Sequence, residues 1–263
     1  MHMRSSLPLR FALGALLNEP EEENISGMNI LALMFRQIKG DLNISSHRWS
    51  MLMNQYLKDP RNEVLQTSRG RSSERSNLNR GLTNPGLTFK NFMKGLRLLA
   101  PLKVTLKMDL EFDNEVTVST SVNIDEEMLY LPFHNEKYPD RQNFLATMFR
   151  NIKNTLEIND EQWRKLMSAY LNNPLNGFVE TTVADSGVKS SVVNGGKRSS
   201  ERSNLTRGLS NPDMSIKVFT KGLKVLNPKQ IYFKVRLEYS GGRSTSHHIQ
   251  VAGNALVAVE GEE

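Results

Sequence analysis

The octapeptide RSSERSNL occurs twice in this chain, at residues 71–78 and again at residues 198–205. Its serines and asparagine can donate and accept hydrogen bonds, and its arginines carry positive charge. Only one of the eight residues is apolar, so packing in a core gives little reason to repeat the segment. These residue types instead suit contact with a polar, anionic partner such as a nucleic acid, whose base edges offer hydrogen bonds and whose phosphates carry negative charge.

Positive charge is concentrated around the two octapeptides. The 263 residues have a formal net charge of +6. Residues 61–107 hold ten Lys or Arg and two acidic residues, and residues 189–236 hold eleven and two, so the remainder of the chain is acidic. Two basic blocks on an acidic background indicate a polyanionic partner.

The octapeptide is the centre of a longer internal repeat. Residues 71–85 match residues 198–212 at 13 of 15 positions, and residues 31–60 align with residues 145–174. The offset rises from 114 to 127 between these stretches, so the second copy has 13 extra residues. They fall within residues 175–198, where glycine and serine predict a flexible loop. Apolar positions differ between the copies whereas the octapeptide does not, which favours contact with a repeated ligand.

Both copies predict the same order of elements. Apolar residues at helical spacing predict two helices in each copy, and a Pro ends the second one. These helices are expected over residues 28–40, 45–58, 142–155 and 160–172. A third, mostly polar helix begins near Ser72 and near Ser199, and an amphipathic fourth helix follows a turn that contains Asn and Pro.

Each copy ends in a segment whose apolar residues alternate with polar ones. In residues 102–112 every second residue is apolar, and residues 231–239 repeat the pattern. A turn and a second alternating run follow, which predicts a β-hairpin in each copy. A single hairpin is only marginally stable in water, so we expect the two hairpins to pair with each other.

These elements predict an α+β fold made of two tandem pseudo-symmetric copies. Each copy is expected to be a small helical bundle of the helix-turn-helix type followed by a C-terminal β-hairpin. The expected parts are an N-terminal extension (1–26), a first repeat (27–124), a connector (125–141), a second repeat (142–254) and an acidic tail (255–263).

The segment SSERSNLTRGLSNPDMSIKVFTKGLKVL, residues 199–226, resembles part of the phage-repressor-like helix-turn-helix family of the lambda-repressor and Cro type. The resemblance covers the recognition helix, the turn and the following helix. That helix ends in KGLKVL in this segment and in KGLRLL in the first copy. The connection before the third helix is longer than in that family. Either the second helix is not the usual support helix, or the connection is an insertion. The TSRGR and GGKR sequences could then act as basic arms along a phosphate backbone or in a minor groove, and a winged-helix arrangement with the hairpins as wings stays open.

The resemblance, carried over position by position, implies ten residues that face bases in a DNA groove. They are Ser73, Glu74, Ser76, Asn77, Arg80, Ser200, Glu201, Ser203, Asn204 and Arg207. Neighbouring basic residues are expected to contact phosphates. They are Arg69, Arg71, Arg75, Lys90, Lys94, Lys197, Arg198, Arg202, Lys217 and Lys221.

No other pattern indicates catalysis, a metal or a cofactor. The chain has no cysteine, so it has no thiolate metal site and no cysteine nucleophile. His247 and His248 are neighbours on a predicted strand and should point to opposite faces, which is poor for chelation. No apolar run approaches the roughly 20 residues that span a membrane. We therefore expect a protein that is not an enzyme and has no metal, cofactor, small-molecule substrate or membrane partner.

The interpretation that accounts for most of these features is a protein that binds double-stranded DNA. We expect a transcriptional regulator that acts as a single-chain pseudo-dimer on two half-sites about 34 Å apart, in the cytoplasm and associated with the nucleoid. Further self-association through the hairpins stays open. The alternatives are a structural or interaction protein whose basic faces bind an acidic protein, and an RNA-binding protein.

Overall fold

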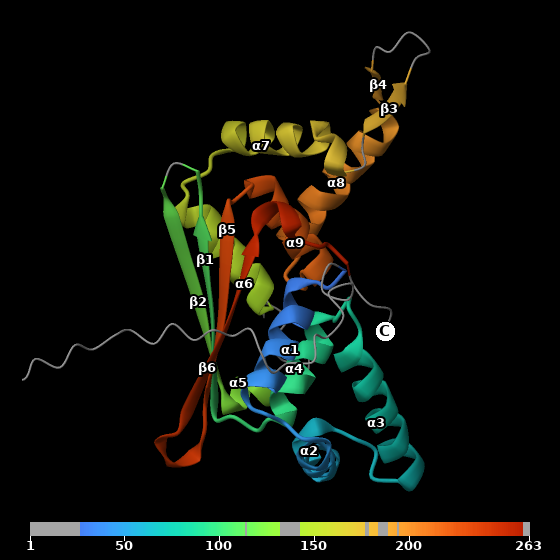
Figure 1. Ribbon diagram of the computed structural model, residues 1–263, viewed down its shortest axis with the longest axis vertical. Coiled ribbons are helices and arrows are strands. Elements are labelled where there is room, and N and C mark those ends of the chain that lie inside the picture. The colour runs from blue at the N-terminus through green and yellow to red at the C-terminus, as the bar shows by residue number, and fades with distance from the viewer. Residues whose placement is uncertain are drawn as a thin grey trace, which may run out of the picture.

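The computed structural model describes residues 27–113, 115–131, 143–176, 179–183, 189–193 and 195–259. Figure 1 shows the predicted helices and hairpins in the expected order, with α5, β3 and β4 in addition. The first part of the chain forms α1 (Ile30–Asp41), α2 (Ser46–Lys58), α3 (Ser68–Thr83), α4 (Phe89–Leu98), β1 (Lys103–Glu111), β2 (Thr117–Asp125) and α5 (Glu126–Tyr130). The second part forms α6 (Phe144–Thr155), α7 (Asp160–Asn172), β3 (Val179–Val183), β4 (Lys189–Val193), α8 (Gly195–Ser210), α9 (Ile216–Leu226), β5 (Gln230–Glu238) and β6 (Ser244–Ala252). Short 3₁₀ turns lie at Pro60–Asn62, Pro174–Asn176, Ser240–Gly242 and Gly253–Ala255.

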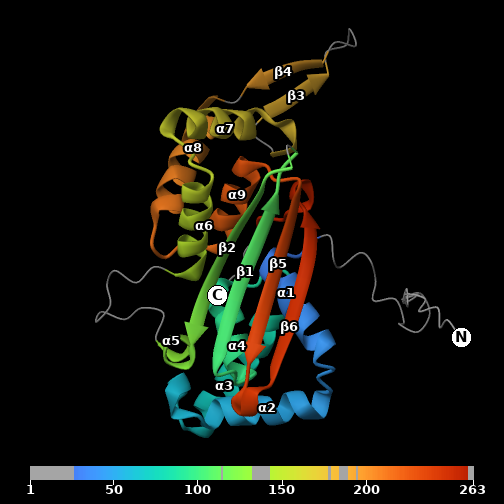
Figure 2. The ribbon, with the colours of Figure 1, turned by 90° about the vertical axis from the view of Figure 1, so that its left-hand side faces the viewer.

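A four-stranded antiparallel sheet in the order β2-β1-β5-β6 gives the molecule its α+β character (Figure 2). β1 and β5 pair at its centre, with Lys107 opposite Lys234, so the expected pairing of the two hairpins is confirmed. Alternate residues of these strands, such as Val104 and Val235, are buried against the helices. The residues between them are mainly charged or polar and form the outer face of the sheet.

The inner face of the sheet is covered by helices from the opposite part of the chain. α1 packs against β6, and α6 packs against β2. One continuous apolar core joins the two parts, and Phe89 on α4 meets Phe144 on α6 with ring centroids 6.1 Å apart. Because each hairpin needs a helix from the other part to bury its apolar face, the two parts share one core.

Two equivalent glycines let α4 and α9 approach their neighbouring helices closely. A Cβ at Gly95 would lie 2.6 Å from the Phe35 ring and 2.7 Å from Leu82. A Cβ at Gly222 would lie at the same distances from Phe149 and Leu209. Any larger residue at either position must push these side chains apart.

Other contacts of the first part recur in the second part. Phe35 meets Trp49 edge to face with centroids 6.3 Å apart, and Phe149 meets Trp163 in the same way at 6.2 Å. The N-cap residue Asn29 donates its backbone N–H to the carbonyl of Pro85 at 2.9 Å. Asn143 makes the same bond to Pro212 at 2.9 Å. Each cap therefore ties the first helix of its part to the turn after the polar helix.

The start of the connector forms a short helix, α5, that the sequence analysis did not predict. It is held by Arg97 of α4, which is only 7% exposed. The Arg97 Nε donates to the carbonyl of Leu129 at 2.6 Å, and Nη2 donates to that of Leu131 at 2.9 Å. Carbonyls at a helix C-terminus lack partners within the helix, so the guanidinium satisfies groups that would otherwise be left buried without hydrogen bonds.

The expectation of a flexible loop is wrong, and the winged-helix alternative does not hold. The extra residues of the second part, expected as a flexible loop, contain β3 and β4, which pair antiparallel with Thr181 opposite Ser191. The C-terminal hairpins belong to the four-stranded sheet, on the side of the molecule away from α3 and α8, so they are not wings (Figure 1).

The two adjacent histidines of β6 point to opposite faces, as predicted. His248 is exposed on the outer face, whereas His247 is 2% exposed. The His247 Nδ1 lies 2.8 Å from a carboxylate oxygen of Asp41 at the end of α1, and Nε2 lies 2.9 Å from the Thr245 hydroxyl. His247 thus fixes the first helix to the last strand.

Candidate nucleic-acid interface

The octapeptides lie on α3 and α8, which are attached to the body by few apolar residues. On α3 only Leu78 and Leu82 are buried, and Leu205 is the buried residue of the same stripe on α8. α3 spans 16 residues, or about 24 Å, so most of its surface is free of the core. Such a helix gains little from burial, which is consistent with a sequence selected for contacts at the surface.

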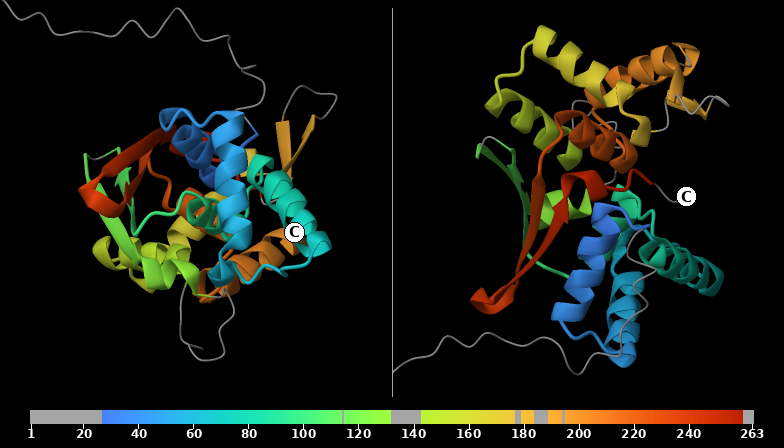
Figure 3. Two further views of the ribbon diagram at one scale, coloured as in Figure 1. Left: turned by 90° about the horizontal axis from the view of Figure 1, so that it is seen from below. Right: turned by 45° about the horizontal axis from the view of Figure 1, so that its top comes forward.

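Both helices lie on the side of the molecule opposite the sheet (Figure 1, and Figure 3, left). In Figure 1 their N-terminal ends lie toward the two far ends of the molecule and their C-terminal ends point toward its middle. The two octapeptides are therefore available on one side, which is the arrangement that two adjacent half-sites require.

Most of the predicted base-facing residues are exposed on these helices. Ser73, Ser76 and Arg80 of α3 follow one another at intervals of three and four residues, so they form one stripe that faces solvent. Ser200, Ser203 and Arg207 occupy the same exposed positions on α8. We call these two sets the outward stripes. Their serines are small, so a ligand can come close to the helix backbone.

An asparagine flanks each outward stripe and bonds to its arginine. The Arg207 Nη2 donates to the Asn204 Oδ1 at 3.0 Å, and Arg80 lies 3.5 Å from Asn77 in the same way. All four residues are exposed. The bond orients each asparagine amide next to the stripe, and the Asn204 Nδ2 in turn donates to the Ser200 hydroxyl at 3.5 Å.

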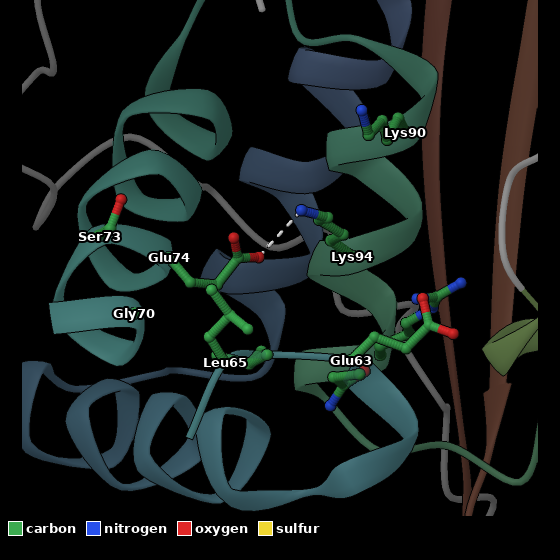
Figure 4. A pocket seen from close by; sticks show the side chains of 10 residues that line it. Glu63, Leu65, Gly70, Ser73, Glu74, Lys90 and Lys94 are labelled. Atoms are coloured by element: carbon green, nitrogen blue, oxygen red, sulfur yellow. Dashed lines mark hydrogen bonds and ion pairs between the residues drawn. The ribbon is translucent and has the colours of Figure 1, made fainter. Parts of the chain in front are cut away.

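Glu74 and Glu201 differ from the other predicted base-facing residues, because their side chains point toward the supporting helices. The Glu74 carboxylate is 2.9 Å from the Lys94 ammonium on α4, and Glu201 is 2.6 Å from Lys221 on α9. Figure 4 shows Glu74 and Lys94 facing each other across the space between α3 and α4. The glutamate side chains are only 21% and 14% exposed. These pairs position α3 and α8 on their supporting helices.

A buried tyrosine lies near each of these charged pairs. Tyr56 at the end of α2 and Tyr170 at the end of α7 are 3% and 6% exposed. Burial, and then the nearby Glu201 carboxylate, raise the pKa of Tyr170 to about 12. Burial and Glu74 raise the pKa of Tyr56 as well. Sequence reasoning missed these Tyr–Glu–Lys clusters, although each glutamate lies four residues before a buried leucine and so shares its face.

Replacement of Tyr170 by Phe should make the protein less sensitive to alkali. A tyrosine in the unfolded chain loses its proton near pH 10, whereas Tyr170 in the folded protein keeps it up to about pH 12. The free energy of unfolding therefore falls as the pH rises through this window, by about 1.4 kcal/mol at pH 11 from this residue. Urea unfolding at pH 8 and pH 11 measures the loss, which should be smaller in Tyr170→Phe. An equal loss in the variant would contradict the expectation.

The predicted phosphate contacts fall into two groups. Arg69, Lys197, Arg202 and Lys217 are exposed, and the other six are partly buried. Arg202 donates to the Ser168 hydroxyl at 3.1 Å, and Arg75 donates to the Asn54 side chain. The Nε of Arg198 is buried without a hydrogen-bond partner beside a pocket of about 350 Å³ between α7 and α8.

A polar groove runs between α3 and α4. It consists of two adjoining pockets of about 430 and 520 Å³ that share Glu74, Lys90 and Lys94. The second pocket is also lined by Asn77 and Arg80, so it opens beside the outward stripe. Lys90 lies on the α4 wall of the groove (Figure 4). The groove therefore brings predicted phosphate and base contacts together.

The predicted basic arms are wrong, because both segments are helical. Thr67 is the N-cap of α3, and its hydroxyl accepts from the Gly70 N–H at 3.0 Å. α3 begins at Ser68 and α8 at Gly195, each four residues earlier than expected. Arg69 and Arg71 therefore lie on the first turn of a helix.

One further contact of α3 was not predicted. The Trp49 Nε1 donates to the Asn79 Oδ1 at 3.1 Å and joins α2 to α3. The corresponding residue of α8 is Thr206. The sequence held a signal for a contact specific to α3, because residue 79 is one of the few positions that differ between two nearly identical segments.

Within the described residues, no three His, Asp or Glu side chains are grouped so that they could hold a metal ion. No helix in the described part has the length and apolarity that crossing a bilayer demands. Comparison of the chain with protein-family models, with curated proteins and with solved structures found no match.

Proposed function

We propose that this chain binds double-stranded DNA as a single-chain pseudo-dimer and acts as a transcriptional regulator. α3 and α8 would each enter the major groove of one half-site, with the half-sites about 34 Å apart. The observation that carries the proposal is that two copies of one polar helix lie on the same side of the molecule, each with a stripe of small and cationic residues turned outward.

The proposal treats the two parts of the chain as tandem copies related by a pseudo-twofold axis. Its support is the recurrence of specific contacts at equivalent positions. Gly95 and Gly222 make the same close approach, and the pairs Glu74–Lys94 and Glu201–Lys221 have the same partners. β1 and β5 pair antiparallel with Lys107 opposite Lys234, which are equivalent residues of the two copies. An antiparallel pair centred on equivalent residues is what a twofold axis produces.

Each residue type of the interface has a role in this proposal. The serines of the outward stripes allow close approach and offer hydrogen bonds to base edges. Asn77 and Asn204 suit adenine, and Arg80 and Arg207 suit guanine or phosphate. We assign Glu74 and Glu201 to the support of the helices and not to base contact, because their carboxylates bind lysines of the body. Lys90 and Lys217 would contact phosphates beside each groove.

The role is one of binding, without catalysis, and it places the protein with the nucleoid in the cytoplasm. Further self-association would use the outer edges of the sheet, β2 and β6, whose outward backbone groups are not paired with another strand of the described chain. A sheet edge of this kind can add a strand from a second molecule.

Selection of bound duplexes from a random pool tests the proposed function. The expected product is an inverted-repeat consensus whose half-sites are centred about one helical turn apart. Enrichment of single-stranded RNA from a parallel RNA pool, or failure to enrich any duplex, would overturn the proposal. If the basic faces bind an acidic protein instead, no duplex should be enriched, because those faces would not discriminate between base sequences.

Replacement of both Asn77 and Asn204 by Ala should relax base preference. The two amides are exposed beside the outward stripes, and the loss of a bidentate contact costs about 1–3 kcal/mol of discrimination at each half-site. Binding to an unrelated duplex should stay within about twofold, because no charge is removed. Competition titrations with consensus and unrelated duplexes measure both quantities. Equal weakening on both duplexes would show that the amides do not read bases.

A further inference from the structure

The two polar helices are identical over the octapeptide but differ at their first turns. α3 begins with Ser68, Arg69 and Gly70, whereas the equivalent residues of α8 are two glycines and Lys197. Both first turns thus carry one cation before the octapeptide, but at positions that are one residue apart. A shift of one residue moves a side chain about 100° around a helix.

Arg69 lies on the same face of α3 as the outward stripe. It lies seven residues before Ser76, which is two turns along the same face, and it is exposed. The equivalent residue of α8, Gly196, is also exposed and has no side chain to reach a ligand. Lys197 occupies the position of Gly70, which is turned about 100° around the helix from Arg69. It therefore does not replace Arg69 on the stripe.

The difference falls at the two far ends of the molecule. The N-terminal ends of α3 and α8 lie outermost in Figure 1, and the identical octapeptides lie closer to the middle. The β3–β4 ribbon precedes α8 directly and stands beside its N-terminal end, whereas α3 follows the short turn at Pro60–Asn62. A ligand that spans both helices meets Arg69 at one end. At the other end it meets Gly196 at the equivalent position, with Lys197 one residue further along and the ribbon beside it.

Resting on the proposed DNA binding, we propose that the target is an inverted repeat with equal inner halves and unequal outer flanks. The octapeptides read the inner positions alike. Arg69 reads a guanine at the outer end of one half-site only, since arginine pairs with the O6 and N7 acceptors of guanine in the major groove. Arg69 therefore sets the orientation of this pseudo-symmetric chain on its site.

The experiment is selection from a random duplex pool with the full chain and three variants. The parent chain should enrich a repeat that has a guanine at one outer flank. Arg69→Gly makes the first turn resemble that of α8 and should abolish the one-sided guanine. Gly196→Arg should create the same preference at the other flank and give a symmetric consensus. Loss of the flanking guanine should cost the parent roughly 5- to 150-fold in affinity and Arg69→Gly less than twofold.

Arg69→Lys separates base contact from phosphate contact. Lysine keeps the charge but lacks the planar fork, so this variant should bind unrelated duplexes like the parent and lose the guanine preference. If the guanine preference at the flank persists in Arg69→Gly or in Arg69→Lys, the assignment of Arg69 is wrong, but duplex binding by the chain still stands. If no duplex is enriched by the parent chain, the proposed function itself fails.

Discussion

Binding to any duplex should weaken by about 10³- to 10⁵-fold when the salt concentration is raised from about 50 to 200 mM. The proposed interface engages roughly 6–10 phosphates, and each neutralised phosphate releases condensed counterions. The entropy gained by this release is smaller at higher salt, so binding weakens. The ten predicted phosphate contacts all lie on or beside α3, α4, α8 and α9. A fluorescence-anisotropy titration at several salt concentrations gives the slope directly.

Matched lysine variants locate this dependence on one face of the molecule. Removal of both Lys90 and Lys217 should reduce the slope of log affinity against log salt by about 1.8. Removal of both Lys107 and Lys234 deletes the same charge from the outer face of the sheet, on the opposite side, and should leave the slope unchanged. Equal slopes in the two variants would show that α4 and α9 do not face the phosphates.

Replacement of Gly95 by Leu should destabilise the protein by about 3 kcal/mol or more, which is the upper end of what overpacking costs. The new side chain would begin 2.6 Å from the Phe35 ring, inside a core that has no room for it. For a chain of this size such a loss lowers the melting temperature by roughly 6–12 °C. Differential scanning calorimetry measures the change.

Gly40 and Gly222 supply the controls for this variant. Gly40 lies in the last turn of α1, and a Cβ there would meet no atom within 4 Å. Gly40→Leu should therefore be neutral or more stable by up to about 1 kcal/mol, because leucine favours helix. Gly222→Leu should cost as much as Gly95→Leu if the two parts are equivalent. A Gly95→Leu protein as stable as Gly40→Leu would refute the close approach.

The helices and strands could be predicted from the sequence because their apolar residues recur at clear periods. Phe89, Phe92 and Leu96 repeat at helical spacing, and Val104, Leu106 and Met108 alternate as in a strand. The first turn of α3 has no apolar residue and contains Gly70, so periodicity could not show it. It is helical because the Thr67 cap satisfies a backbone N–H that a helix start leaves unpaired.

The β3–β4 hairpin and the orientation of Glu74 could also have been predicted from the sequence, but the packing of α1 could not. Residues 179–183 are rich in Val and Thr, and residues 189–193 are rich in Val and Ser. Five residues that include Asp, Ser and Gly separate them, which is a hairpin pattern. The position of Glu74, four residues before the buried Leu78, already places it on the attached face of α3. The packing of α1 on β6 could not be predicted, because periodicity identifies an apolar face but not the element that covers it.

The bond between Asp41 and His247 joins residues 206 positions apart. At roughly 5–20 residues per second, ribosomes need about 10–40 s to make the intervening chain. Throughout that time the apolar side of α1 has no β6 to cover it, and for much of it β1 has no β5 beside it. The newly made first half must therefore wait, exposed, for the last strand to emerge, so its yield in a cell depends on protection from aggregation during translation.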